Sequence, residues 1–247
     1  VPEIDTSPYA DAAADPRAVA LRLAALYRLV DPQAEPPQLV VASVRSLLRR
    51  TIPPAEFLRL CTRWSEGEEL SREDAVAALQ RAGYTRVDVV EDPGTYAVRG
   101  GVIDVFVGCA RFPVRVEFYG DLIERLRLFD PESQRSLRAV PAVAIHPVRE
   151  TVATTAAPLR PRVLALADAA LAPSSKSRQI VDNLEQGLEF FGVEALTPIF
   201  HEAMAPLWDY LPRATRWVVE EPDALVQAAE EYWQETTEQH GRALAEH

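Results

Sequence analysis

Residues 85–147 alternate between apolar and polar side chains with a period of two, and turn-forming residues interrupt the pattern at short intervals. Alternation of this kind is typical of strands that bury one face. The interruptions combine Gly, Pro and Asp, which favour tight turns: they are Asp92-Pro93-Gly94, Gly100-Gly101, Gly120-Asp121 and Asp130-Pro131. We therefore predict an antiparallel meander of about five strands.

Helical patterns precede this region. Asp15 followed by Pro16 indicates a helix start, since Asp caps the first turn and proline fits the first helical position. Apolar residues then recur on one helical face as far as Val30. After a proline-rich linker, the apolar run at residues 39–44 predicts a buried strand of the parallel type. A helix followed by a buried strand indicates part of an α/β layer.

Helical patterns return after the alternating region. Residues 162–171 and 177–191 are predicted helices, the second because Ile180, Leu184 and Leu188 share one face. A short strand is predicted at Trp217-Val218-Val219. The last third of the chain is therefore expected to be mostly helical.

The order of these patterns predicts an inserted module. Composition changes at Pro53-Pro54 and at the polar stretch of residues 64–69, which we interpret as a domain boundary. A capping box that starts at Ser71 and a C-terminal Gly83 predict one short helix before the strands. We expect an α/β fold with an inserted α+β module, in which residues 1–59 and 148–247 flank a module at 60–147.

Charge and cysteine content exclude several functional classes. The formal net charge is −11, so the surface as a whole is poorly suited to bind a phosphate backbone. Cys61 and Cys109 lie far apart with no clustered His, which indicates neither a disulfide framework nor a zinc site. No apolar run is long enough for a membrane span, and we expect a reduced, cytoplasmic setting without a membrane partner.

The sequence also lacks recognisable catalytic patterns. Lys176 is the only lysine, and its neighbours include none of the glycines that a phosphate-binding loop needs. Gly100-Gly101 precedes a strand, whereas a dinucleotide fingerprint opens a helix. The four histidines are scattered, and no nucleophile elbow is present. We expect no catalytic residue, cofactor or metal in this chain.

One face of the predicted sheet has the composition of a protein interface. Arg115, Glu117 and Tyr119 alternate with apolar residues and so point to one side of their strand, and on the strand Thr95 to Arg99 the residues Thr95, Ala97 and Arg99 share one face. Arginine, an acid and an aromatic together supply bidentate and stacking contacts. Acids on a sheet face, here Asp104 among them, also commonly pair with neighbouring arginines. The alternation alone leaves a docking face and an ordinary salt-bridged face equally open.

Longer segments within the predicted module resemble a known family. They are Ala82-Gly83-Tyr84, then PGTYAVRGGVIDVF from Pro93, PVRVEFYGDLIE from Pro113 and LFDPESQRS from Leu128. They are similar to the module shared by the excision-repair helicase UvrB and the bacterial transcription-repair coupling factors. The last of them, with PLWDYLP from Pro206, favours the coupling factors, and the aromatic-rich damage-probing hairpin of UvrB is missing.

The resemblance implies a fold and a partner. The flanking parts would be degenerate halves of a UvrB-like, helicase-like domain (1a-like at residues 1–59, 1b-like at 148–247), and the inserted antiparallel sheet module would bind the repair protein UvrA. By the resemblance, UvrA-contacting residues fall on Arg99 and Arg115, and an aromatic contact falls on Tyr119, where the family often has phenylalanine. Glu117 shares their face and matches an acid of UvrB.

The resemblance also implies what lies elsewhere. In the parent protein an ATP- and Mg-dependent motor, RNA-polymerase binding and double-stranded-DNA binding would belong to other domains, so this chain would recruit UvrA without being an enzyme. Two alternatives stay open: a fragment of a UvrB-type damage-processing ATPase, and a docking face that another domain of the parent covers.

Overall fold

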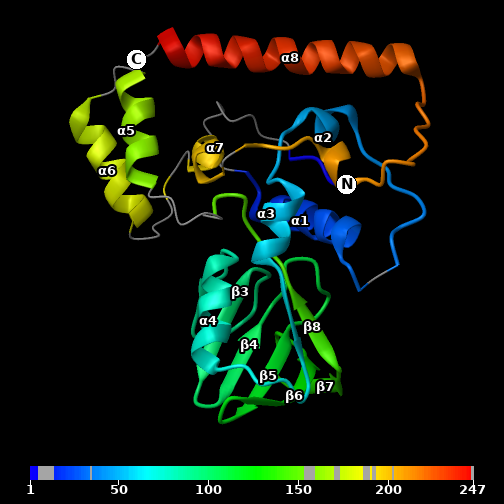
Figure 1. The fold of residues 1–247 in the computed structure, drawn as a ribbon, viewed down its shortest axis with the longest axis vertical. Helices are drawn as coiled ribbons and strands as arrows, with labels where there is room; N and C mark the ends of the chain where they lie inside the picture. Colours follow the sequence, from blue (N-terminus) through cyan, green and yellow to red (C-terminus); the bar gives the residue numbers. More distant parts are fainter. Residues whose placement is uncertain are drawn as a thin grey trace.

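The computed structural model describes residues 1–4, 14–33, 35–152, 159–169, 173–185, 190, 193–201 and 203–245. Strands gather in one part of the molecule and most helices in the other (Figure 1). The smaller of the two sheets is antiparallel, and the larger is antiparallel except for one pair of strands. This confirms a mixed α/β fold built around antiparallel strands.

The larger sheet has six strands in chain order. They are β2 (Thr85–Arg86), β3 (Thr95–Arg99), β4 (Val102–Val105), β5 (Val114–Tyr119), β6 (Leu122–Phe129) and β7 (Ser136–Ala139). Strands β3 to β7 form the predicted antiparallel meander, and the two-residue β2 adds a parallel pair beside β3. Gly100 and Gly120 take positive φ angles of 57° and 61° in the hairpin turns, where glycine is favoured.

The inner face of this sheet carries the largest hydrophobic core. Helix α4 (Arg72–Arg81) packs over it and places Ala75 and Leu79 against Ile103, Val116 and Leu126, all fully buried. The Ser71 hydroxyl accepts a hydrogen bond from the Asp74 amide at 3.0 Å, which confirms the predicted helix start. Gly83 follows the helix with φ of 83°, as expected for a helix C-terminus.

A second, two-stranded sheet connects this module to the rest of the chain. Strand β1 (Thr62–Ser65) pairs antiparallel with β8 (Ala142–Ile145), so that Thr62 lies opposite Ile145. Trp64 of β1, the first residue of the stretch that we interpreted as a boundary, is buried in the core of the module. The chain therefore reaches and leaves the large sheet through neighbouring strands.

The N-terminal helices form a second core. Helix α1 (Pro16–Val30) starts at the predicted Asp15 cap, whose carboxylate accepts a hydrogen bond from the Arg17 amide. Its Leu23 and Leu26 pack with Phe57 of α3 (Pro54–Leu60) and with Tyr210. Arg22 of α1 is fully buried and donates to the carbonyl oxygens of Ser46 and Arg49, at 3.2 and 3.3 Å.

The strand predicted at residues 39–44 is wrong. Ser43 caps a short helix, α2 (Val44–Leu48), by accepting a hydrogen bond from the Ser46 amide, so the helix takes the end of the apolar run. In the part of the chain that the structure describes, no strand pairs with residues 39–43, and Leu39 and Val41 are 80% and 72% exposed. An apolar run shows that a segment could be buried, but it does not supply a neighbouring strand.

The short strand predicted at Trp217-Val218-Val219 is also wrong. These residues have no regular secondary structure, and Val218 is 93% exposed. The reason is the same, because no described residue offers them a ladder of backbone hydrogen bonds.

The predicted predominance of helix after the sheet module is confirmed. Helices α5 (Leu159–Ala169) and α6 (Ser174–Glu185) start slightly earlier than predicted. Residues 170 and 171 of the first prediction, and 186–189 and 191 of the second, lie outside the described residues. The remaining elements are η1 (Val193–Leu196), α7 (Thr197–Phe200), η2 (Leu207–Tyr210) and α8 (Pro222–Ala245). Among the described residues, no helix combines the length and apolarity needed to cross a membrane.

Candidate protein-docking face

The outer face of the large sheet is organised around one buried carboxylate. Asp104 of β4 lies opposite Arg115 of β5 and Ala97 of β3, and its side chain is 3% exposed. Arg115 donates from Nε to Oδ1 at 2.7 Å and from Nη2 to Oδ2 at 2.8 Å. This bidentate pair raises the pKa of the Arg115 guanidinium, chiefly through its hydrogen bonds to Asp104. Asp104 therefore holds the guanidinium of Arg115 in a defined position.

Two further contacts hold Arg115. Its Cζ lies 4.6 Å from the centre of the Phe129 ring, and its Nη1 donates to the Gln134 carbonyl oxygen at 3.4 Å. Phe129 belongs to a small core on this face with Val90, Ala97 and Phe106. Gln134 has a positive φ of 59° in the turn after β6. The Arg115 side chain is therefore only 21% exposed, with its guanidinium held by Asp104, Phe129 and Gln134.

Arg99 lies on the same carboxylate but is much more open. Its Nη2 is 3.9 Å from Asp104 Oδ2, and its side chain is 52% exposed. A contact of this length between a buried acid and a half-exposed arginine is weak. The two predicted arginines thus share Asp104, with Arg115 inside and Arg99 at the surface.

The other two predicted residues extend this face along β5. Glu117 lies one step beyond Arg115 on the same side, opposite Val102, and its Oε1 is 3.8 Å from Arg127 Nε of β6. Tyr119, at the end of β5, is 78% exposed. The expected ion pairs of Asp104 and Glu117 with neighbouring arginines are present. Arg99 and Tyr119 nevertheless keep most of their surface in solvent.

Sequence reasoning missed three contributors to this face. Arg127, Phe129 and Gln134 support the predicted residues from β6 and from the turn that follows it. Alternation along β6 could have placed Arg127 on the outer face opposite Arg115, given the antiparallel register. The position of Gln134 depends on a turn that the alternation does not specify.

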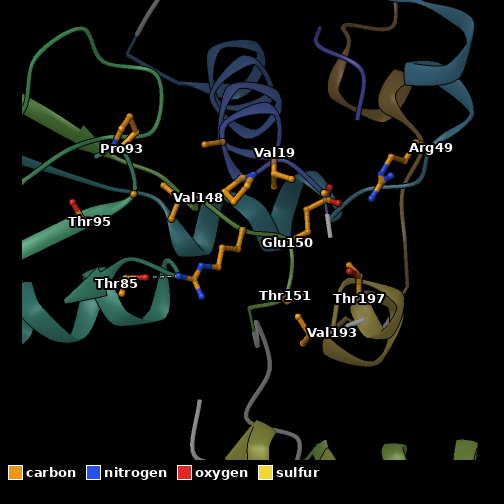
Figure 2. Close-up of a pocket in the computed structure, with 15 residues that line it drawn as sticks. Val19, Arg49, Thr85, Pro93, Thr95, Val148, Glu150, Thr151, Val193 and Thr197 are labelled. Atoms are coloured by element: carbon orange, nitrogen blue, oxygen red, sulfur yellow. Dashed lines mark hydrogen bonds between the residues drawn. The ribbon is translucent and has the colours of Figure 1, made fainter. Parts of the chain in front are cut away.

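A pocket of about 270 Å³ lies at the junction of the sheet module with α1 and α7 (Figure 2). Its walls include Val19 of α1, Thr95 of β3 and Thr197 of α7. Arg149, also in the wall, donates a hydrogen bond to the Thr85 hydroxyl. None of the predicted docking residues lines it, and the described residues contain no group of three or more His, Cys, Asp and Glu placed to hold a metal ion.

Comparison with known proteins identifies the family. Residues 63–150 match the family model described as the UvrB interaction domain. Over 99% of its length the chain is 37% identical to the transcription-repair-coupling factor of Myxococcus xanthus. The chain belongs to the transcription-repair-coupling factor family, in its N-terminal, UvrB-like region. This confirms the resemblance drawn from the sheet segments.

Further coupling factors match with similar coverage. That of Escherichia coli is 30% identical over 85% of the chain, whereas UvrABC system protein B of Acinetobacter baylyi is 32% identical over only 60%. The chain spans 21% of the Myxococcus xanthus coupling factor and 18% of the Escherichia coli one. All four predicted docking residues lie inside the matched interaction domain.

Proposed function

We propose that this chain is the part of a coupling factor that recruits UvrA in nucleotide excision repair, through a docking face formed by Arg99, Arg115, Glu117 and Tyr119. The observation that carries the proposal is the shared carboxylate of Asp104, which holds Arg115 rigidly and leaves Arg99 half exposed beside it. The face lies within the residues that match the UvrB interaction domain.

The arrangement suits a partner with carboxylates and an apolar contact. Arg115 is already held in place, so binding a partner costs little side-chain entropy at this position. Arg99 can turn from its long contact with Asp104 toward an incoming acid, and Tyr119 offers an exposed ring for burial. Arginine and tyrosine are residues that commonly dominate binding energy at protein interfaces.

In the full-length protein this role would serve a larger cycle. The parent would be an ATP-dependent DNA translocase that displaces stalled RNA polymerase, with its motor, ATP and Mg sites, polymerase contacts and double-stranded-DNA contacts outside this chain. The chain itself would not be an enzyme. In support, its only lysine, Lys176, lies on α6 in a segment without glycine.

The alternative is a fragment of a UvrB-type damage-processing ATPase, which the similarity to UvrABC system protein B favours. The two functions differ in nucleotide binding. Titration of the chain with ATP and Mg²⁺ by calorimetry separates them, because only a UvrB-type nucleotide site would give saturable binding.

The docking proposal is tested by measuring UvrA affinity. We expect the double variant Arg99→Ala with Tyr119→Ala to bind UvrA at least about tenfold more weakly, since it removes two exposed contacts of the hot-spot type. Arg138→Ala, on exposed strand β7 of the same sheet, is the matched control and should bind normally. Unchanged affinity of the folded double variant would overturn the proposal.

A further inference from the structure

The C-terminal arm of the chain, residues 213–242, combines negative charge with exposed apolar side chains. It contains seven acidic residues against three arginines. The acids are Glu220, Glu221, Asp223, Glu230, Glu231, Glu235 and Glu238. Its exposed large apolar residues are Trp217, Val218, Val219, Val226 and Trp233. Such apolar exposure is unusual for a segment that faces only water.

The long helix of this arm has little support. Helix α8 has 24 residues, about 36 Å in length, and crosses above the five-residue helix α2 (Figure 1). Arg45 of α2 holds it, with Nη2 3.3 Å from Glu235 Oε2 and Cζ 5.4 Å from the centre of the Tyr232 ring. The main packing partner of α8 is this short helix, and isolated helices are only marginally stable in water, so α8 depends on few tertiary contacts for its stability.

The apolar residues of α8 occupy a face other than the one on α2. Val226 and Trp233 are seven residues apart, close to two helical turns, and therefore share a face. They are 55% and 72% exposed, whereas Leu225 and Tyr232, one position earlier, are half-buried. A tryptophan presented on a helix is a typical anchor for insertion into a groove on a protein.

We infer that the C-terminal arm docks onto a basic protein surface with an apolar groove, which lies in the part of the full-length coupling factor outside this chain. The acidic residues around Trp233 repel nucleic acid and anionic membranes, and they complement arginine and lysine. The matched Myxococcus xanthus coupling factor supplies ample surface, because this chain covers only 21% of it. The inference assumes that this chain is part of a longer coupling factor, as proposed above. It does not assume that the chain binds UvrA.

Hydrogen exchange tests the inference. Peptides from residues 222–242 are compared between this chain and the full-length protein, at low and high salt. We expect exchange at least about tenfold slower in the full-length protein, a difference of about 1.4 kcal/mol, and a smaller difference at high salt. Equal exchange in both proteins would overturn the inference. So would protection that grows with the concentration of the isolated chain, since the occupant would then be a second copy.

A pair of variants locates the contact. Trp233→Glu in the full-length protein should return exchange of α8 to the rate seen in this chain, whereas Gln234→Glu adds the same charge at the adjacent exposed position and should preserve the protection. Protection that survives Trp233→Glu would also overturn the inference. Both variants should bind UvrA like the unmodified protein, because the arm lies outside the docking face, so this result and the docking result can fail separately.

Discussion

Arg115 and Asp104 lie opposite each other on neighbouring strands, and two nitrogens of the guanidinium donate to the two oxygens of the carboxylate. The acid is almost completely buried, and the only other arginine paired with it in the described structure is Arg99, at 3.9 Å. Arg115 therefore stabilises the sheet as well as belonging to the proposed docking face. Experiments on this face must separate these two roles.

Removal of Arg115 should destabilise the fold, independently of any effect on UvrA binding. Arg115→Ala leaves the Asp104 carboxylate buried with one distant partner, so we expect the free energy of unfolding to fall by about 3 kcal/mol. Arg138→Ala, an exposed control, should change it by less than about 0.5 kcal/mol. Urea unfolding measures both, and equal values for the two variants would show that the pair contributes nothing to stability.

Tyr119 should act through its ring and not through its hydroxyl. The side chain is 78% exposed and ends a strand, so both Tyr119→Phe and Tyr119→Ala should leave the melting temperature nearly unchanged. Tyr119→Phe should keep UvrA affinity, and Tyr119→Ala should weaken it about tenfold. Calorimetry with purified UvrA distinguishes the two, and an equal loss for both variants would assign the contact to the hydroxyl.

His146 should make stability depend on pH. Burial lowers the pKa of its imidazole below the ordinary value of 6.5, and the ring stacks on Tyr27 with Nδ1 3.0 Å from the Pro147 carbonyl oxygen. Below pH 6.5 the unfolded chain takes up a proton that the folded chain resists. The free energy of unfolding should therefore fall as the pH drops from 7 toward 5, by at most about 1.4 kcal/mol per pH unit from this residue.

The control for this effect is His146→Gln, compared with the unmodified chain by urea unfolding at each pH. Other titrating groups act in both proteins, so the difference between the two curves isolates His146. The curves should converge as the pH falls. Parallel curves would exclude the proposed contribution.

Gly108 should be required for close packing between the sheet module and α1. A methyl group added there would lie 2.8 Å from Cβ of Ala20. Gly108→Ala should therefore lower the free energy of unfolding by about 1–3 kcal/mol, the usual cost of overpacking. Ala20→Gly alone should cost about 1 kcal/mol, as glycine does inside a helix. The double variant should lose less than the sum of the two, and strict additivity would show that this contact does not limit stability.

The elements that could be predicted are those with local signals. The meander follows from alternation and turn residues, α1 from the Asp15 cap, and α4 from the Ser71 cap. The shared side of Arg115, Glu117 and Tyr119 follows from the period of a single strand. These features need no information about distant residues.

The features that could not be predicted depend on distant parts of the chain. Arg115 lies over Phe129 because of the register between β5 and β6, and the pairing shifts at Glu117/Phe118 and at Leu128/Phe129 are not visible in alternation. The apolar run at residues 39–44 has the composition of a strand, but pairing requires a neighbour. A sequence pattern indicates which secondary structures a segment could form, and contacts with distant residues determine which one it adopts.

The pairing of Thr62 with Ile145 in the two-stranded sheet bears on how this architecture could arise and change. A module whose two ends are already hydrogen-bonded neighbours adds little loop-closure entropy to its host, however long it is. Its whole length could be deleted, exchanged or grafted onto another scaffold through two adjacent junctions. Such an exchange would also have to preserve the surface around Gly108 that packs against Ala20 of α1.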